Sequence, residues 1–226
     1  MALSAPTPLD RPAISLEPPL GPLAAVAAGL FVAGLVLSTV LAGGSPFPSP
    51  FGSADDAFAY FRDHSGAVRT GAVLQFASAI PLVLYVAGVA ARVRRIADGF
   101  APALTTIGGT LAAAFLICSA VVSWVLTVPE VATDPALIRA LHTLAFLCGG
   151  PGNVMPTGLL IAGIALSARP RRRLAPWLLT AGLVIAFIAL CTTASLTVTA
   201  AAFLLPIARF TGMAWLIAVG FLLPRA

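Results

Sequence analysis

The sequence predicts an all-α fold: a polytopic membrane bundle of six transmembrane helices with one short amphipathic helix at the outer interface. Of the 226 residues, 59% are hydrophobic and only 9% are charged, whereas a soluble domain is typically about 25% charged. The mean hydropathy is +1.01. Apolar runs of about 20 residues match a hydrocarbon thickness of roughly 30 Å. Six such runs cover 20–42, 68–91, 101–127, 137–168, 175–196 and 203–224.

The segment before the first apolar run has the composition of a tail. Residues 1–19 contain five prolines together with Asp10, Arg11 and Glu17, and they lack the basic start of a secretory signal. We expect 1–19 to be a disordered cytoplasmic tail. Residues 20–226 are then a single six-helix transmembrane domain.

The arginines indicate the orientation in the membrane. They follow the second, fourth and sixth runs, at Arg92, Arg94, Arg95, Arg169, Arg171, Arg172, Arg173 and Arg225. The positive-inside rule places these ends in the cytoplasm, and an even number of spans puts both termini there. Thirteen arginines without a lysine favour a GC-rich bacterial genome, so we expect the cytoplasmic (inner) membrane. This topology signal explains the net charge of +5, so the lipid bilayer is the expected partner and nucleic acid is not.

Two features surround the first loop. The first run carries Ala25, Gly29 and Ala33 at four-residue spacing, and such small residues let helices pack closely, either within the subunit or against a second copy or membrane partner. After the loop, Ser53 can cap a helix over 53–64, whose residues Ala57 and Phe61 belong to one apolar stripe. We expect this helix to lie at the outer interface, as a covered loop or as a lid over the bundle.

The fourth run has the most unusual polar residues. Arg139 and His142 are three positions apart and share a helix face. The glycines and proline at Gly149, Gly150, Pro151 and Gly152 then break the helix, and Asn153 follows near mid-depth. Ionisable groups and broken backbone are both costly in hydrocarbon, so we expect them to face protein or water.

Polar residues of the even-numbered spans form a candidate ligand-binding cluster in the outer half of the bundle. Its members are Arg69, Gln75, Arg139, His142, Asn153 and Arg209. One interpretation pairs each arginine with an acid or with helix-end carbonyls, which makes a structural or accessory subunit without a ligand. The other converges them on an outward-facing cavity that binds, senses or transports a small or lipid-like anionic ligand, such as a phosphate or carboxylate.

Enzymatic and haem functions have less support. The chain has two histidines, His64 and His142, without the ligand spacing of a metal or haem site. The cysteines Cys118, Cys148 and Cys191 all lie in apolar runs and form no paired motif. We therefore predict no catalytic residue, metal or cofactor, and keep a haem-binding or membrane-embedded enzyme as a minor alternative.

The chain also contains traces of an internal repeat. Residues 101–108 match 175–182 at five of eight positions, and Arg69, Arg139 and Arg209 are spaced by 70 residues. Three tandem helical hairpins explain both observations. Chance similarity in a chain so rich in alanine and leucine is the alternative.

The layout resembles a family of actinobacterial multi-pass membrane proteins to which no function is assigned. The resemblance rests on the outer segment with Asp, Phe and Tyr, on the Arg69-containing helix that ends in Ala-Arg-Val-Arg-Arg, and on the Gly-Gly-Pro-Gly break. It implies a six-helix membrane fold and carries over no site residue.

Overall fold

The computed structural model describes residues 18–169 and 173–224, and this part of the chain is entirely helical apart from its connections. Most of the expected tail, residues 1–17, lies outside the described residues. The helices are α1 (Leu20–Leu41), α2 (Ala54–Asp63), α3 (Ser65–Ile96), α4 (Phe100–Val125), α5 (Pro135–Gly149), α6 (Pro151–Ala168), α7 (Pro176–Cys191) and α8 (Leu204–Leu222), with short 3₁₀ turns η1 (Val131–Thr133), η2 (Thr192–Leu196) and η3 (Thr199–Phe203).

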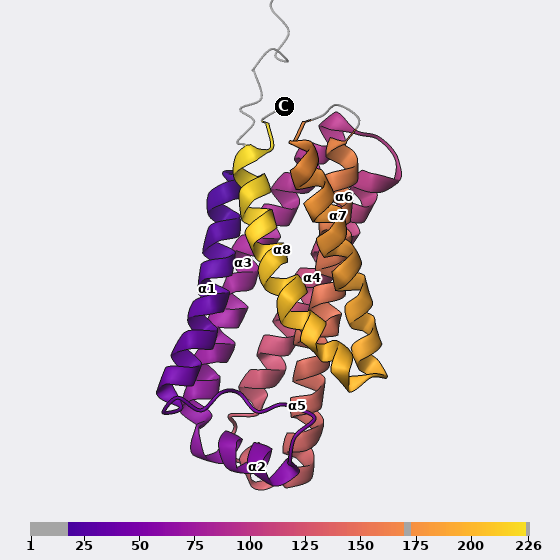
Figure 1. Cartoon of the computed structure of the whole chain (residues 1–226). Helices are drawn as coiled ribbons and strands as arrows, with labels where there is room; N and C mark the ends of the chain where they lie inside the picture. The colour runs from indigo at the N-terminus through magenta and orange to yellow at the C-terminus, as the bar shows by residue number, and fades with distance from the viewer. Residues whose placement is uncertain (1–17, 170–172, 225–226) are drawn as a thin grey trace, which may run out of the picture.

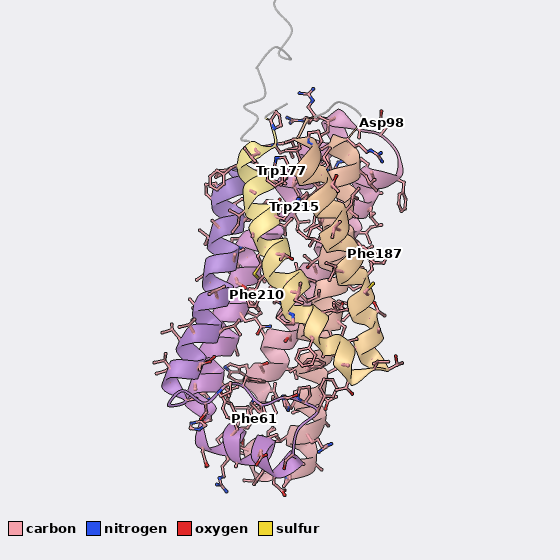
Figure 2. All side chains as sticks on the ribbon, viewed as in Figure 1. Phe61, Asp98, Trp177, Phe187, Phe210 and Trp215 are labelled. Carbon is pink, nitrogen blue, oxygen red and sulfur yellow. The ribbon has the colours of Figure 1, made fainter. Side chains whose placement is uncertain are left out.

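Six helical segments are long and apolar enough to cross a membrane, and α5 with α6 counts as one of them. The predicted fold class is thereby confirmed, and the fold is that of a multi-pass membrane protein. Large apolar side chains cover the outside of the bundle. Phe187, for example, is 67% exposed and projects from α7 (Figure 2). Exposed apolar surface of this kind suits lipid rather than water.

The six spans alternate in direction, and both described ends of the chain lie at the same end of the bundle (Figure 1). That end, here called the arginine-rich end, carries Arg92, Arg94, Arg95, Arg169 and Arg173. The opposite end is called the α2 end. Along the bundle α1 packs on α3, α4 packs on α3 and α6, and α7 packs on α6 and α8.

The short helix α2 lies across the α2 end, as the sequence predicts (Figure 1). The Ser53 hydroxyl accepts hydrogen bonds from the backbone N–H groups of Asp55 and Asp56, which is the expected N-cap. Its apolar face is turned into the bundle, where Phe61 is fully buried. Burial also raises the pKa of Tyr60, so this phenol stays protonated at neutral pH. Helix α2 therefore seals the bundle beside α3 and α5.

Helix α8 is fixed to its neighbours mainly at the arginine-rich end. The Tyr85 hydroxyl donates to the Leu216 carbonyl at 3.3 Å, and the Trp215 indole N–H donates to the Leu178 carbonyl at 2.8 Å. Gly21 of α1 and Gly220 of α8 meet so closely that a Cβ on Gly220 would lie 2.8 Å from the Gly21 nitrogen. From this contact the two helices diverge toward the α2 end (Figure 1).

The arginines of the proposed repeat occupy equivalent helix positions. Arg69 and Arg139 are the fifth residues of α3 and α5, and Arg209 is the sixth residue of α8. In the matched segments, Gly108 packs on α6 and Gly182 packs on Trp215 of α8, so each glycine faces the following span. The surroundings of the three arginines nevertheless differ.

Candidate ligand cavity

The break in the fourth span separates α5 from α6 at Gly150. Pro151 is the first residue of α6, where its missing N–H costs no helical hydrogen bond. Close packing requires the glycines here: a Cβ on Gly149 would collide with the Ser119 side chain, and one on Gly150 would lie 2.7 Å from the Phe146 carbonyl oxygen. The break leaves the carbonyl of Gly149 without a helical partner.

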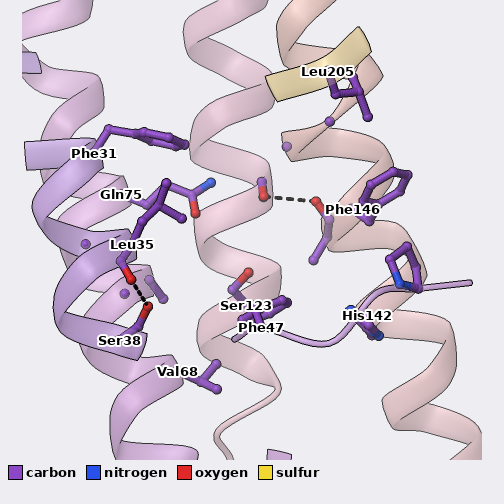
Figure 3. Close-up of a pocket in the computed structure, with 18 of the residues that line it drawn as sticks. Phe31, Leu35, Ser38, Phe47, Val68, Gln75, Ser123, His142, Phe146 and Leu205 are labelled. Atoms are coloured by element: carbon purple, nitrogen blue, oxygen red, sulfur yellow. Dashed lines mark hydrogen bonds between the residues drawn. The ribbon is translucent and has the colours of Figure 1, made fainter. Parts of the chain in front are cut away.

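A cavity of about 330 Å³ lies beside this break, between the helices and on the inner side of the loop that joins α1 to α2 (Figure 3). Most of its wall is apolar, with the rings of Phe31, Phe47 and Phe146 prominent. Its polar side chains are Ser38, Gln75, Ser119, Ser123, His142 and Arg209. A mostly apolar cavity with a few convergent polar groups is typical of a small-molecule site.

On the side where α1 and α8 diverge, the cavity is lined by exposed side chains. Leu35 of α1 and Phe210 of α8 both line it, and they are 43% and 46% exposed. Phe210 projects from the lower half of α8 (Figure 2). The wall of the cavity on this side is therefore apolar and partly exposed at the flank of the bundle.

Arg209 supplies the cationic group of the cavity. Its Nη2 donates to the Gly149 carbonyl, and its guanidinium lies 5.1 Å from the ring centroid of Phe31. Its Nε is buried and has no hydrogen-bond partner among the described residues. Across 18–169 and 173–224, the only ion pair joins Arg62 to Asp63 on α2, so no described carboxylate neutralises Arg209.

Gln75 and His142 add further hydrogen-bonding capacity. The Gln75 amide donates to the Leu116 carbonyl at 3.4 Å, a long contact, and its side-chain oxygen accepts no hydrogen bond from a described residue. The His142 Nε2 lies 3.1 Å from the Pro48 carbonyl oxygen. Since a carbonyl only accepts, Nε2 carries the proton, and in the neutral ring Nδ1 is an acceptor.

The connecting loop covers the α2 end of the cavity through Phe47, Pro48 and Pro50. The Phe47 ring packs edge-on against Phe61 and His142, with centroids 5.3 and 5.5 Å apart. The loop leaves α1 through Gly43 and Gly44, whose φ angles of 66° and 88° suit glycine. The loop, rather than α2 itself, is the cover of the cavity.

The structure thus brings Gln75, His142, Gly149, Gly150 and Arg209 of the predicted set to one cavity. It does not bring the other members there. Arg69 donates to the Thr127 hydroxyl and carbonyl and lies over the Trp124 ring, so it fastens α3 to the end of α4.

The remaining predicted residues also lie elsewhere. Arg139 is exposed on α5, although it shares a helix with His142. Asn153 is buried and donates to the Ala112 carbonyl at 2.8 Å, which joins α6 to α4. Pro151 and Gly152 are the first residues of α6 and do not line the cavity.

Residues that sequence reasoning missed include Phe31, Phe47 and Pro48. Phe31 is one of many apolar letters in α1, so nothing in the sequence marks it. Prolines at every second position from 46 to 50, with Phe47 and Phe51 beside them, are the available signal for an ordered, aromatic loop.

The fold and the cavity define the class of this protein as a multi-pass membrane protein with an internal cavity between its helices. In comparisons with known proteins, no family model, curated protein or solved structure matches the chain. Among the described residues, no three His, Cys, Asp or Glu side chains lie close enough together to share a metal ion.

Proposed function

We propose that this protein resides in a bacterial cytoplasmic membrane and binds an amphipathic anionic ligand in the cavity that the α1–α2 loop covers. The observation that carries the proposal is the Arg209 guanidinium, which reaches the cavity without a carboxylate partner among the described residues. An arginine at the centre of a span costs about 2.5–3.5 kcal/mol on insertion scales. A bound anion offsets this cost, because a guanidinium donates well-directed hydrogen bonds to phosphate or carboxylate oxygens.

The cavity wall supports an amphipathic ligand rather than a small inorganic anion. Arg209, Gln75 and His142 are polar, but aromatic and aliphatic side chains surround them. We propose that the ligand enters between Leu35 and Phe210, at the side of the bundle, where lipid chains surround a membrane protein. A molecule dissolved in the bilayer can therefore enter without crossing water.

The orientation rests on charge. The arginine-rich end is proposed to be cytoplasmic by the positive-inside rule. The α2 end carries the acids Asp55, Asp56, Asp63, Glu130 and Asp134. With this orientation both termini are cytoplasmic, and the cavity lies in the outer half of the membrane, covered by the loop. Uptake, sensing or transfer of the ligand then starts from the outer leaflet.

Two amphiphiles with the same chain and opposite charge test the proposal. The protein in phosphatidylcholine nanodiscs is heated with dodecyl phosphate or with dodecyltrimethylammonium, and the unfolding temperature is measured. We expect stabilisation by dodecyl phosphate alone, reaching about 2.7 kcal/mol at roughly 100 times its Kd.

The matched control is a second arginine. Arg209→Gln should abolish the stabilisation by dodecyl phosphate, whereas Arg139→Gln, which removes the same charge from an exposed site, should keep it. Equal stabilisation by both amphiphiles, or stabilisation that survives Arg209→Gln, contradicts the proposal. If dodecyl phosphate has no effect and Arg209→Gln only lowers the basal stability, Arg209 serves to hold the broken helix, as in an accessory subunit.

A further inference from the structure

A second, smaller cavity of about 50 Å³ lies next to the ligand cavity, on the side toward the arginine-rich end. Phe31 lines both cavities and therefore forms the wall between them. The smaller one is called the tail pocket here, and its residues come from α1, α3, α4 and α8. They are Ala24, Ala27, Ala28, Phe31, Ser78, Leu82, Tyr85, Leu116, Met213 and Leu216.

The polar groups of the tail pocket are already satisfied. The Ser78 hydroxyl donates to the Gln75 carbonyl at 2.6 Å, and the Tyr85 hydroxyl donates to the Leu216 carbonyl at 3.3 Å. The pocket consequently offers hydrocarbon, alanine methyls and a methionine thioether to anything inside it. Such a surface fits an alkyl chain, and the unbranched side chain of Met213 adapts to one.

The position of Arg209 relates the two cavities to each other. Its guanidinium stacks over the Phe31 ring, so the cation stands at the wall that the cavities share. From Phe31 to Ala24 the pocket follows α1 for about 10 Å, at 1.5 Å per residue. The tail pocket thus begins directly beside an acidic group bound at Arg209. A chain attached to that group reaches the pocket once the Phe31 ring turns aside.

We infer that the ligand is a single-chain amphiphile whose acidic headgroup binds Arg209 and whose hydrocarbon chain ends in the tail pocket between α1 and α8. This assignment rests on the proposed function and specifies its ligand. The volume of about 330 Å³ in the ligand cavity is near the lower limit of about 300 Å³ for small-molecule sites. The tail pocket, at about 50 Å³, has room only for the end of one chain, so the second chain of a diacyl lipid has to remain in the bilayer.

A photoreactive fatty acid shows where the hydrocarbon chain of the ligand binds. Decanoic acid with a diazirine at its terminal carbon is added to the protein in phosphatidylcholine nanodiscs, and cross-linked residues are identified by mass spectrometry. We expect saturable labelling of Leu82, Met213 and Leu216, which unlabelled decanoic acid displaces. Phosphatidic acid, the diacyl competitor, should displace it poorly.

Two variants on α1 separate a specific pocket from general lipid contact. Ala28→Leu fills the tail pocket and should lower labelling of Met213 roughly tenfold, which corresponds to about 1.4 kcal/mol. Gly29→Leu is the matched control, because a Cβ at Gly29 meets nothing within 4 Å and the added side chain points into open space. It should leave the labelling unchanged.

The outcomes distinguish the two proposals. The acid could label only exposed residues such as Val36 and Ile207, to the same extent in the wild-type protein and in Ala28→Leu. That result overturns the proposal that the chain binds in the tail pocket. The proposed function then survives through the Arg209-dependent stabilisation by dodecyl phosphate. If no labelling is saturable and no anionic amphiphile stabilises the protein, both proposals fail. Efficient displacement by phosphatidic acid overturns the single-chain assignment alone.

Discussion

The His142 Nε2 and the Pro48 carbonyl oxygen lie 3.1 Å apart, and this hydrogen bond joins α5 to the loop that covers the ligand cavity. The Phe47 ring packs against the same imidazole from the neighbouring position. One buried side chain thus forms part of the cavity wall and also holds its cover. Movement of the loop and access to the cavity from the α2 end are therefore coupled through His142.

Replacing His142 by alanine is expected to loosen the loop without unfolding the bundle. The variant loses a hydrogen bond worth about 1 kcal/mol and a ring contact of about 0.5–1.5 kcal/mol. Hydrogen exchange at the amides of Phe51 and Gly52, which are hydrogen-bonded within the loop, should then accelerate by roughly tenfold or more. The control is His64→Ala, whose ring contacts Tyr60 rather than the loop. Unchanged exchange in His142→Ala would show that the aromatic contacts alone hold the loop.

Adding one methyl group at the helix break should be costly. In Gly149→Ala the new Cβ collides with Ser119, whose hydroxyl donates to the Ala145 carbonyl at 2.9 Å and cannot move freely. We expect a loss of about 1–3 kcal/mol, measured by unfolding in mixed micelles. Gly29→Ala is the control, since it meets open space and gains helix propensity of up to about 1 kcal/mol. Equal stability of the two variants would mean that the helices separate readily at the break.

Asn153 is expected to contribute to stability and not to ligand binding. Asn153→Ala removes the hydrogen bond from its amide to the Ala112 carbonyl, which connects α6 with α4. Interhelical hydrogen bonds in membranes average about 0.6 kcal/mol and reach about 1.7 kcal/mol, so we expect a loss in that range. Stabilisation by dodecyl phosphate should be unchanged. Loss of that stabilisation in a folded Asn153→Ala protein would show that Asn153 does contribute to ligand binding.

The sequence predicts the six spans and the α2 helix well, because hydropathy and capping are local signals. It predicts the site only in part, for a physical reason. In a membrane helix the lipid-facing and core-facing residues are equally apolar. The hydropathy pattern therefore indicates how deep a residue lies in the membrane, but not whether it faces lipid or the interior of the bundle. Arg139 and Arg209 hold similar positions in α5 and α8, yet one is exposed and the other contacts Gly149. That contact joins residues 60 positions apart, and no local pattern encodes it.

The orientation of the protein is testable with single cysteines. In a background where Cys118, Cys148 and Cys191 are replaced by alanine, Asp56→Cys places a thiol on the exposed face of α2. A membrane-impermeant maleimide should label it in intact cells, because the positive-inside rule puts the α2 end outside.

The matched control for this orientation is Asp98→Cys, which places an equally exposed thiol between α3 and α4 at the arginine-rich end. It should react only after the cells are permeabilised. The reverse pattern would invert the bundle, and the loop over the cavity would then face the cytoplasm. Because the ligand cavity lies nearer the α2 end, that result would also move the source of the ligand to the inner leaflet.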